Sequence, residues 1–201
     1  MNEIPAVKSP ALWRYEVDVK FLNPFVQAAV EVLKAELDAN AVRGEVTLQK
    51  SSMTSDDITV LINLIGDVYG VVMYGMSTET CLKLVSKILG QEFTEFNTLA
   101  QSGVAELGNV ISGQATIRFS ESGFKSNIST PTVLNGNGVE ISTLDFPRVV
   151  VPLETQFGVL TVHLALREKK TGEAHLADKF IESIKTPVVQ NDTQSPPVAT
   201  G

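Results

Sequence analysis

Residues 64–72 read Leu-Ile-Gly-Asp-Val-Tyr-Gly-Val-Val, and residues 152–160 read Pro-Leu-Glu-Thr-Gln-Phe-Gly-Val-Leu. Each stretch holds the end of an apolar run, a tight turn, an aromatic residue, a glycine and the start of a second apolar run. This pattern is typical of a β-hairpin. Although any two hairpins share some of these features, the aromatic residue and the glycine stand at the same offset in both stretches. The match indicates an internal repeat.

A long helix is predicted upstream of each hairpin, so the order helix, strands, hairpin occurs twice. We therefore expect an α/β (α+β) fold built as a pseudo-twofold helix-plus-hairpin repeat. In this fold the two halves share one antiparallel or mixed sheet, and the two long helices pack on it.

Hydrophobic spacing assigns the individual elements. Apolar residues recur every three and four positions in three predicted helices, which span residues 24–37, 78–89 and 98–119. Asn23 is the expected cap of the first helix, and Gly90 is the expected end of the second. Alternating or continuous apolar runs predict strands at residues 42–50, 58–65, 68–76, 139–142, 148–153 and 158–166.

Both ends of the chain lack this periodicity. Residues 1–16 are predicted to form an N-terminal arm, residues 17–168 the folded domain, and residues 169–201 a polar and partly disordered C-terminal tail. Residues 173–184 could form a short helix within that tail. The 201 residues are enough for one compact domain with its tails.

Composition excludes several classes of function. The formal net charge is −7, and no cluster of Lys and Arg is interleaved with aromatic residues. Binding to nucleic acid or to anionic membranes is therefore disfavoured, and a partner with a positive patch is favoured. The longest apolar stretches are strand-sized, and the first residues lack the basic start and apolar block of a secretory signal. We expect a cytoplasmic protein.

Side chains that commonly bind metals or act as nucleophiles are scarce. Cys81 is the one cysteine, and its place in an amphipathic helical stretch indicates a buried structural thiol. His163 falls in a predicted strand and His175 in the polar tail. We therefore expect no metal site and no Ser-His-Asp or Cys-His arrangement.

The predicted helix at residues 98–119 has two contrasting faces, because successive side chains on a helix turn by about 100°. The apolar stripe, expected to face the core, consists of Ala100, Val104, Leu107 and Ile111. The opposite stripe consists of Ser102, Glu106, Asn109 and Gly113. An acid, Glu106, and an amide, Asn109, are thus presented side by side, one turn apart and toward solvent.

Two features distinguish this outward face. It is flanked by the small residues Gly103, Ala105, Gly108 and Gly113, although a glycine inside a helix costs about 1 kcal/mol relative to alanine. No Lys or Arg occurs between Thr98 and Ile117, whereas solvated faces usually mix both charge signs. Close approach by another backbone would explain the glycines, but close packing of the two long helices would explain them as well. From the spacing alone, the structural interpretation ranks ahead of the functional one.

The spacing Ser102-x-x-x-Glu106-x-x-Asn109 resembles the signature of the CheC/CheX/FliY phosphatases of bacterial chemotaxis. Residues 105–113, Ala-Glu-Leu-Gly-Asn-Val-Ile-Ser-Gly, are similar to that family throughout. Residues 18–25 resemble the start of a CheX-type domain, and residues 131–133 resemble a further family feature. The resemblance extends over residues 17–167 and is closest to CheX.

This resemblance implies a phosphatase that acts on a phosphorylated CheY-like response regulator. By analogy, Asn109 holds the attacking water and Glu106 pairs with a lysine of the partner. Ser102, Glu106 and Gly113 are expected to contact that partner. The resemblance also implies that the chain itself binds no cofactor, that the response regulator supplies the Mg²⁺, and that the protein is a homodimer joined through the sheet.

Aligning the two predicted long helices places Glu31 and Lys34 opposite Glu106 and Asn109. A lysine cannot accept a hydrogen bond from water. We therefore expect one active site in the chain, unless Glu31 and Lys34 are ordinary surface residues and the alignment carries no information.

Two other functions remain open at this point. The same fold could dock a response regulator, or another chemotaxis component, without catalysis, but a pure docking surface has no need of the Asn109 amide. A structural dimer of unrelated function would leave the face of Glu106 and Asn109 unused.

Overall fold

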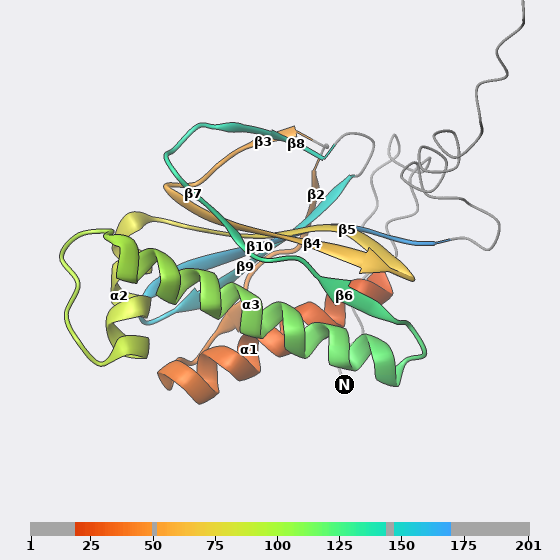
Figure 1. Cartoon of the computed structure of the whole chain (residues 1–201), viewed down its shortest axis with the longest axis horizontal. Coiled ribbons are helices and arrows are strands. Elements are labelled where there is room, and N and C mark those ends of the chain that lie inside the picture. Colours follow the sequence, from red (N-terminus) through yellow and green to blue (C-terminus); the bar gives the residue numbers. More distant parts are fainter. Residues whose placement is uncertain (1–18, 50–51, 144–146, 170–201) are drawn as a thin grey trace, which may run out of the picture. The chain divides into compact units, whose positions relative to one another are not determined.

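The computed structural model describes residues 19–49, 52–143 and 147–169 (Figure 1). The chain divides into two units, Met1–Lys169 and Lys170–Gly201, and every element below belongs to the first. The predicted N-terminal arm, the predicted helix at residues 173–184 and the C-terminal tail lie outside the described residues, so their boundaries stay predictions.

The centre of the fold is a sheet with the strand order β1-β9-β10-β5-β4-β6, in which β2 also pairs with β9 and β7 with β4. The four long strands are β4 (Ile58–Gly66), β5 (Val68–Met76), β9 (Arg148–Thr155) and β10 (Gly158–Glu168). The short edge strands are β1 (Val42–Arg43), β2 (Thr47–Gln49), β6 (Ser126–Ile128) and β7 (Thr132–Asn135). Every pairing among the described strands is antiparallel.

The sheet is symmetric about the pair of β5 and β10, as a pseudo-twofold fold requires. β5 and β10 pair at the centre, β4 and β9 flank them, and short strands occupy both edges. The short strands that follow the first long helix pair with the second hairpin, and those that follow the other long helix pair with the first hairpin. The two halves are therefore interlocked by an exchange of edge strands, and the predicted fold class is confirmed.

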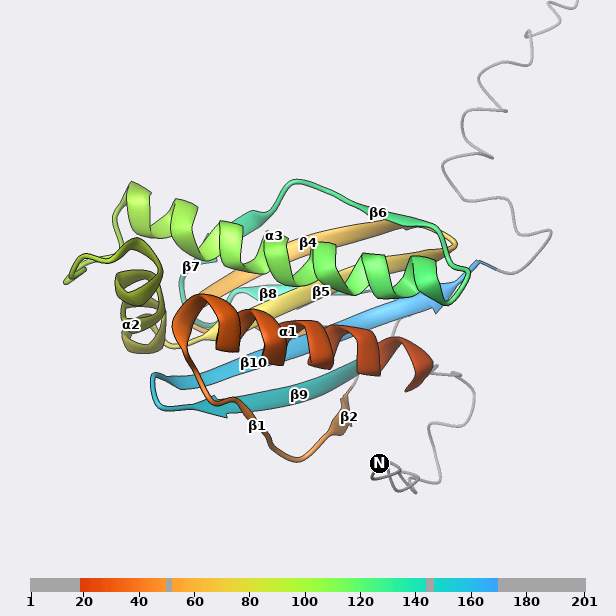
Figure 2. The ribbon, with the colours of Figure 1, turned by 90° about the horizontal axis from the view of Figure 1, so that it is seen from below.

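The helices cover one face of the sheet. They are α1 (Leu22–Leu37), preceded by one 3₁₀ turn η1 (Val19–Phe21), α2 (Thr78–Leu89) and α3 (Thr98–Glu121). Figure 2 shows α1 and α3 side by side across the sheet, with α2 at one end of the pair. On the opposite side of the sheet, β3 (Ser52–Thr54) and β8 (Glu140–Ser142) form a separate two-stranded ribbon (Figure 1).

The main core lies between the helices and the sheet. Along each long strand, alternate residues point to the helices, as the period of two in a strand requires. On β4 and β5 these buried residues are Ile58, Val60, Ile62, Leu64, Val68, Val72, Tyr74 and Met76. Phe119 of α3 makes edge-to-face contacts with Phe21 and Phe25, which ties the start of α1 to the end of α3.

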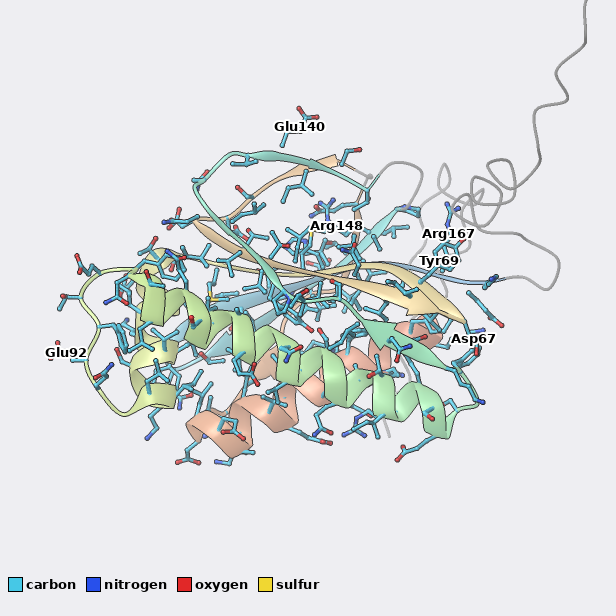
Figure 3. All side chains as sticks on the ribbon, in the orientation of Figure 1. Asp67, Tyr69, Glu92, Glu140, Arg148 and Arg167 are labelled. Atoms are coloured by element: carbon cyan, nitrogen blue, oxygen red, sulfur yellow. The ribbon has the colours of Figure 1, made fainter. Side chains whose placement is uncertain are left out.

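The other face of the sheet holds a buried polar pair beneath the ribbon of β3 and β8. Arg148 of β9 donates through Nε to Nδ1 of His163 on β10 at 3.2 Å, and through a terminal nitrogen to Gln49 at 2.6 Å. Burial and the adjacent guanidinium lower the pKa of His163 to about 4. The imidazole is therefore neutral at pH 7 and can accept this bond. Figure 3 labels Arg148 on this side of the sheet, away from α1 and α3.

Three predicted details of the first half and the edges are wrong. Asn23 is not a cap, because α1 begins earlier and its capping position is Phe21. The strand predicted at residues 42–50 is two short strands separated at Gly44, where a Cβ would lie 2.9 Å from the side chain of Pro152. β6 and β7 were not predicted, because their short polar sequences become strands only by pairing with the edge of β4.

The two glycines that suggested the repeat are not equivalent in the structure. Gly70 lies inside β5, where it pairs with Leu64 on one side and Leu166 on the other. Gly158 is the first residue of β10 and pairs with Thr155 across the turn. The symmetry of the fold is therefore one of topology, and the matching offset in the sequence does not mark matching sites.

Candidate functional site

The start of α3 is fixed by a cap that the sequence contains locally. Asn97 precedes the helix in an extended conformation, and its Oδ1 accepts hydrogen bonds from the backbone N–H groups of Leu99 at 3.1 Å and Ala100 at 3.0 Å. A cap of this kind typically contributes about 1 kcal/mol. The helix then runs for 24 residues, two beyond the predicted end.

The rotation of α3 about its own axis is set by its buried side. Ala100, Val104, Leu107 and Ile111 are all buried, as the apolar stripe predicted. The hydroxyl groups of Tyr74 on β5 and Ser112 lie 2.8 Å apart in a hydrogen bond that is fully buried. Burial raises the pKa of the Tyr74 phenol, so it stays protonated. This polar contact between helix and sheet holds the opposite face of α3 toward solvent.

Glu106 and Asn109 lie together on that outward face. Nδ2 of Asn109 donates to Oε2 of Glu106 at 3.4 Å. The Glu106 side chain is exposed and Asn109 is half-buried. The predicted juxtaposition of acid and amide is therefore present, and Oδ1 of Asn109 accepts no hydrogen bond from the described residues.

The other two residues of the predicted stripe are Ser102, which carries a hydroxyl group, and Gly113, which leaves open space. The Ser102 hydroxyl donates to the carbonyl oxygen of Thr98 within the helix at 3.1 Å, although the residue is exposed. Gly113 is half-buried, and a Cβ there would have nothing within 4 Å. The surface beyond Asn109 is thus open, and the Ser102 oxygen can still accept a hydrogen bond from outside.

Two of the small residues that were expected beside this face lie on the buried side. A Cβ on Gly103 would be 3.3 Å from Leu89 and 3.4 Å from Val85, both on α2. A Cβ on Gly108 would be 3.0 Å from Val60 and 3.2 Å from Tyr74 in the sheet. Both glycines therefore allow α3 to approach its own neighbours closely. Neither a partner's backbone nor contact between the two long helices accounts for them.

The corresponding face of α1 is occupied by ion pairs. Glu31 is paired with Arg118 of α3, and Lys34 is paired with Asp38 at the end of its own helix. Glu31 is thus held by a cation of this chain, and no amide stands beside it at the spacing of Glu106 and Asn109. The acid and amide spacing of Glu106 and Asn109 is therefore not repeated at Glu31 on α1.

Of the other reactive side chains, Cys81 is structural, and His175 lies outside the described residues. Cys81 is fully buried, and burial raises the pKa of its thiol to about 12, so it is protonated at neutral pH. Across residues 19–49, 52–143 and 147–169, no group of three or more His, Cys, Asp or Glu is placed to hold a metal ion. None of the helices described there is long and apolar enough to cross a membrane.

Sequence reasoning missed the contribution of Tyr74 and Ser112. Ser112 follows Ile111 and falls on the core side of α3, where a polar residue is unusual. That position could have indicated a buried hydrogen bond, but its partner on β5 is 38 residues away in the chain and could not be identified from spacing.

Comparison with known families yields one model that covers the site. The model described as "Chemotaxis phosphatase CheX" matches residues 58–154, a stretch that contains the whole of α3. A curated relative, the CheY-P phosphatase CheX of Thermotoga maritima, is 26% identical over 128 residues. The match covers 63% of this chain and 83% of that relative.

Solved structures give the same picture of the fold. A chemotaxis protein CheX from Desulfovibrio desulfuricans matches with a TM-score of 0.66 and 25% identity, over 75% of this chain and 99% of that one. A CheX in a complex with CheY, BeF₃ and Mg²⁺ from Borrelia burgdorferi matches with a TM-score of 0.63 and 27% identity. That match covers 74% of this chain and 98% of the other.

Proposed function

Since this chain belongs to the CheC/CheX/FliY family of chemotaxis phosphatases and is most like CheX within it, we propose that it hydrolyses the aspartyl phosphate of a CheY-like receiver domain. The observation that carries the proposal is the solvent-facing pair on α3, in which Asn109 Nδ2 lies 3.4 Å from Glu106 Oε2. The relative from Thermotoga maritima, described as a CheY-P phosphatase, and the solved complex of CheX with CheY support the class of substrate.

The proposed role of Asn109 is to position the attacking water. In the reaction, the water oxygen bonds to phosphorus, the bond from phosphorus to the aspartyl oxygen breaks, and the carboxylate leaves. The two products are inorganic phosphate and the unmodified aspartate, and the proton of the water passes to the phosphate and solvent. A carboxylate is a good leaving group and needs no strong acid, so placing the water in line is the main task left to the protein.

The bond to Glu106 orients the amide for this task. Because Nδ2 of Asn109 points to Glu106, Oδ1 is directed away from it and can accept a hydrogen bond from a water. An amide does not titrate near pH 7, so it serves over a wide range of pH. The receiver's Mg²⁺ would spread the charge on the phosphoryl oxygens.

The proposed role of Glu106 toward the partner is to pair with a lysine beside the phosphoryl group. Its carboxylate is exposed, and no Lys or Arg occurs from Thr98 to Ile117 to compete for it on α3. Arg118, the first cation after that stretch, is engaged with Glu31. The acidic side chain is thus available to a cation from outside.

The test is the decay of a phosphorylated receiver domain with Mg²⁺, in the presence and absence of this protein. Each response regulator of the source organism is tried in turn. We expect faster release of phosphate with at least one of them, at protein concentrations well below that of the receiver. Binding without faster release would remove the phosphatase function and leave a noncatalytic docking module.

A Gly113→Ala variant is expected to separate stability from function. The added methyl group meets nothing within 4 Å, and alanine favours a helix interior over glycine by about 0.5–1 kcal/mol. The midpoint of urea denaturation should therefore rise. If Gly113 lies under the docked receiver, as proposed, KM for the phosphorylated receiver should increase severalfold. An unchanged KM would remove Gly113 from the partner-binding set.

Two other predictions made from the sequence are compatible with this proposal. A protein that acts on a receiver domain has to be in the same compartment as that domain, which is compatible with the cytoplasmic location predicted from the sequence. The predicted homodimer joined through the sheet stays a prediction, and sedimentation of the purified protein would decide it.

A further inference from the structure

A small hollow adjoins the acid–amide pair where the three helices meet. It has a volume of about 230 Å³ and is lined by the second half of α1, the end of α2 and the first half of α3. Glu106 and Ser102 form part of its wall. Glu92, labelled in Figure 3, lies in the loop that joins α2 to α3 and marks this end of the helical layer.

The hollow is apolar and open. Leu99 is 50% exposed and Leu89 is 38% exposed, and both line it. Gly103 also lines it, and the absence of a side chain there leaves room beside Leu89. Large apolar side chains that gather at one exposed hollow, next to polar residues, are typical of a site that binds another protein.

The charge of the hollow has one sign. Its ionisable lining residues are Glu36 and Glu106, and both are exposed. Neither carboxylate forms an ion pair with another described residue. The hollow therefore suits an apolar side chain that is flanked by a lysine or arginine. The apolar side chain would pack against the leucine residues, and the cation would lie beside the two glutamates at the rim.

The position of the hollow identifies its occupant. Glu106 is shared by the hollow and by the proposed catalytic pair. A stable protein interface buries about 800 Å² on each partner, which is far more than two neighbouring side chains one helical turn apart can provide. A receiver domain that binds with its phosphoryl group at Asn109 therefore has to contact neighbouring surface as well. The hollow is part of that surface, because Glu106, the neighbour of Asn109, lines it.

Resting on the proposed function, we propose that this hollow is a docking pocket for the phosphorylated receiver domain. It receives an apolar side chain, next to a basic one, from the receiver surface beside the phosphoryl group. Leu99 and Leu89 contribute binding, and Glu36 contributes charge complementarity. The pocket thus selects among receiver domains by the side chains around their phosphorylation site, which Asn109 alone cannot distinguish.

The decisive comparison is between Leu99→Ser and Ile117→Ser. Both leucine and isoleucine lie on α3 with similar exposure, 50% and 55%, but Ile117 does not line the hollow. Initial rates are measured over a range of concentrations of phosphorylated receiver. We expect Leu99→Ser to raise KM about tenfold with little change in kcat, as for a docking contact that holds the ground state and the transition state equally. We expect Ile117→Ser to leave KM within twofold of the wild type.

Direct binding provides a second measurement that does not depend on turnover. Leu99→Ser, Ile117→Ser and Glu36→Gln are each placed in an Asn109→Ala background, and Kd for the phosphorylated receiver is measured. Leu99→Ser should weaken binding about tenfold. Glu36→Gln should weaken it two- to threefold at low salt, and this difference should vanish at high salt because exposed charges are screened.

The outcomes separate this inference from the proposed function. If the wild type accelerates dephosphorylation but Leu99→Ser and Ile117→Ser behave alike, the pocket is excluded and the phosphatase stands. If binding depends on Leu99 without any acceleration, the pocket stands and the phosphatase is excluded. Absence of binding to any receiver overturns both. If Leu99→Ser changes only the self-association of this protein, the hollow is a contact between its copies and the inference is wrong.

Discussion

Asn109→Ala is expected to lower the rate of receiver dephosphorylation about 100-fold or more. The variant removes both the group that accepts from the attacking water and the amide that contacts Glu106. Loss of one positioned hydrogen-bonding group from an active site typically costs a factor of 10²–10³ in kcat. Single-turnover decay of the phosphorylated receiver, with the variant in excess, measures this effect on the chemical step.

Binding of the receiver should survive this substitution, because Asn109 is half-buried and contributes little contact area. Gln114→Ala is the matched control: it removes an exposed amide from the same helix, away from the contact with Glu106. We expect Gln114→Ala to retain the wild-type rate. If Asn109→Ala accelerates the decay as well as the wild type does, the mechanism proposed here is wrong even if the protein is a phosphatase.

Gly70→Ala is expected to destabilise the domain by more than about 3 kcal/mol. Gly70 has a φ of 134°, which residues with a side chain rarely adopt. A Cβ there would lie 2.1 Å from the carbonyl oxygen of Ala165 and 3.1 Å from Cα of Leu166, both backbone atoms of β10. Because backbone atoms in a paired strand cannot rotate away, β5 and β10 would have to separate at the centre of the sheet.

The matched control for this variant is Gly123→Ala. Gly123 also has a positive φ, of 88°, but a Cβ there would meet nothing within 4 Å. It therefore isolates the conformational cost, about 1–2 kcal/mol for a left-handed residue with a side chain. Urea denaturation of both variants gives the comparison. Equal losses for the two variants would mean that β10 yields at Ala165 and that the central pairing is not rigid.

Most of the fold could be predicted from the sequence, because the hydrophobic periodicities and turn residues that define its elements are local. Helical spacing gave the extent of α2 and most of α3, and the turns at Asp67 and Gln156 marked the two hairpins. Helix starts were less accessible. Asn23 has the chemistry of a cap, but burial of Phe21 and Leu22 in the core extends the helix past it. Packing outweighed the local capping preference at that position.

The candidate site shows the same division. That Glu106 and Asn109 are neighbours follows from a spacing of three residues in any α-helix. That they face outward follows from the apolar stripe on the other side. The spacing could not tell that Gly103 and Gly108 face inward, because a glycine carries no hydrophobic signal of its own. It also could not tell that Glu31 pairs with Arg118, which is 87 residues away.

The sequence by itself determined most of the three helices, the four long strands and the composition of the outward face of α3, since these depend on periodicities of two and 3.6 residues within one continuous segment. Only the tertiary structure decided which strands exchange between the halves, which surface the two glycines of α3 approach, and where Leu89 and Leu99 form a hollow beside Glu106. Those features arise between segments far apart in the chain. They depend on the free energy of packing the whole core, which no single segment encodes.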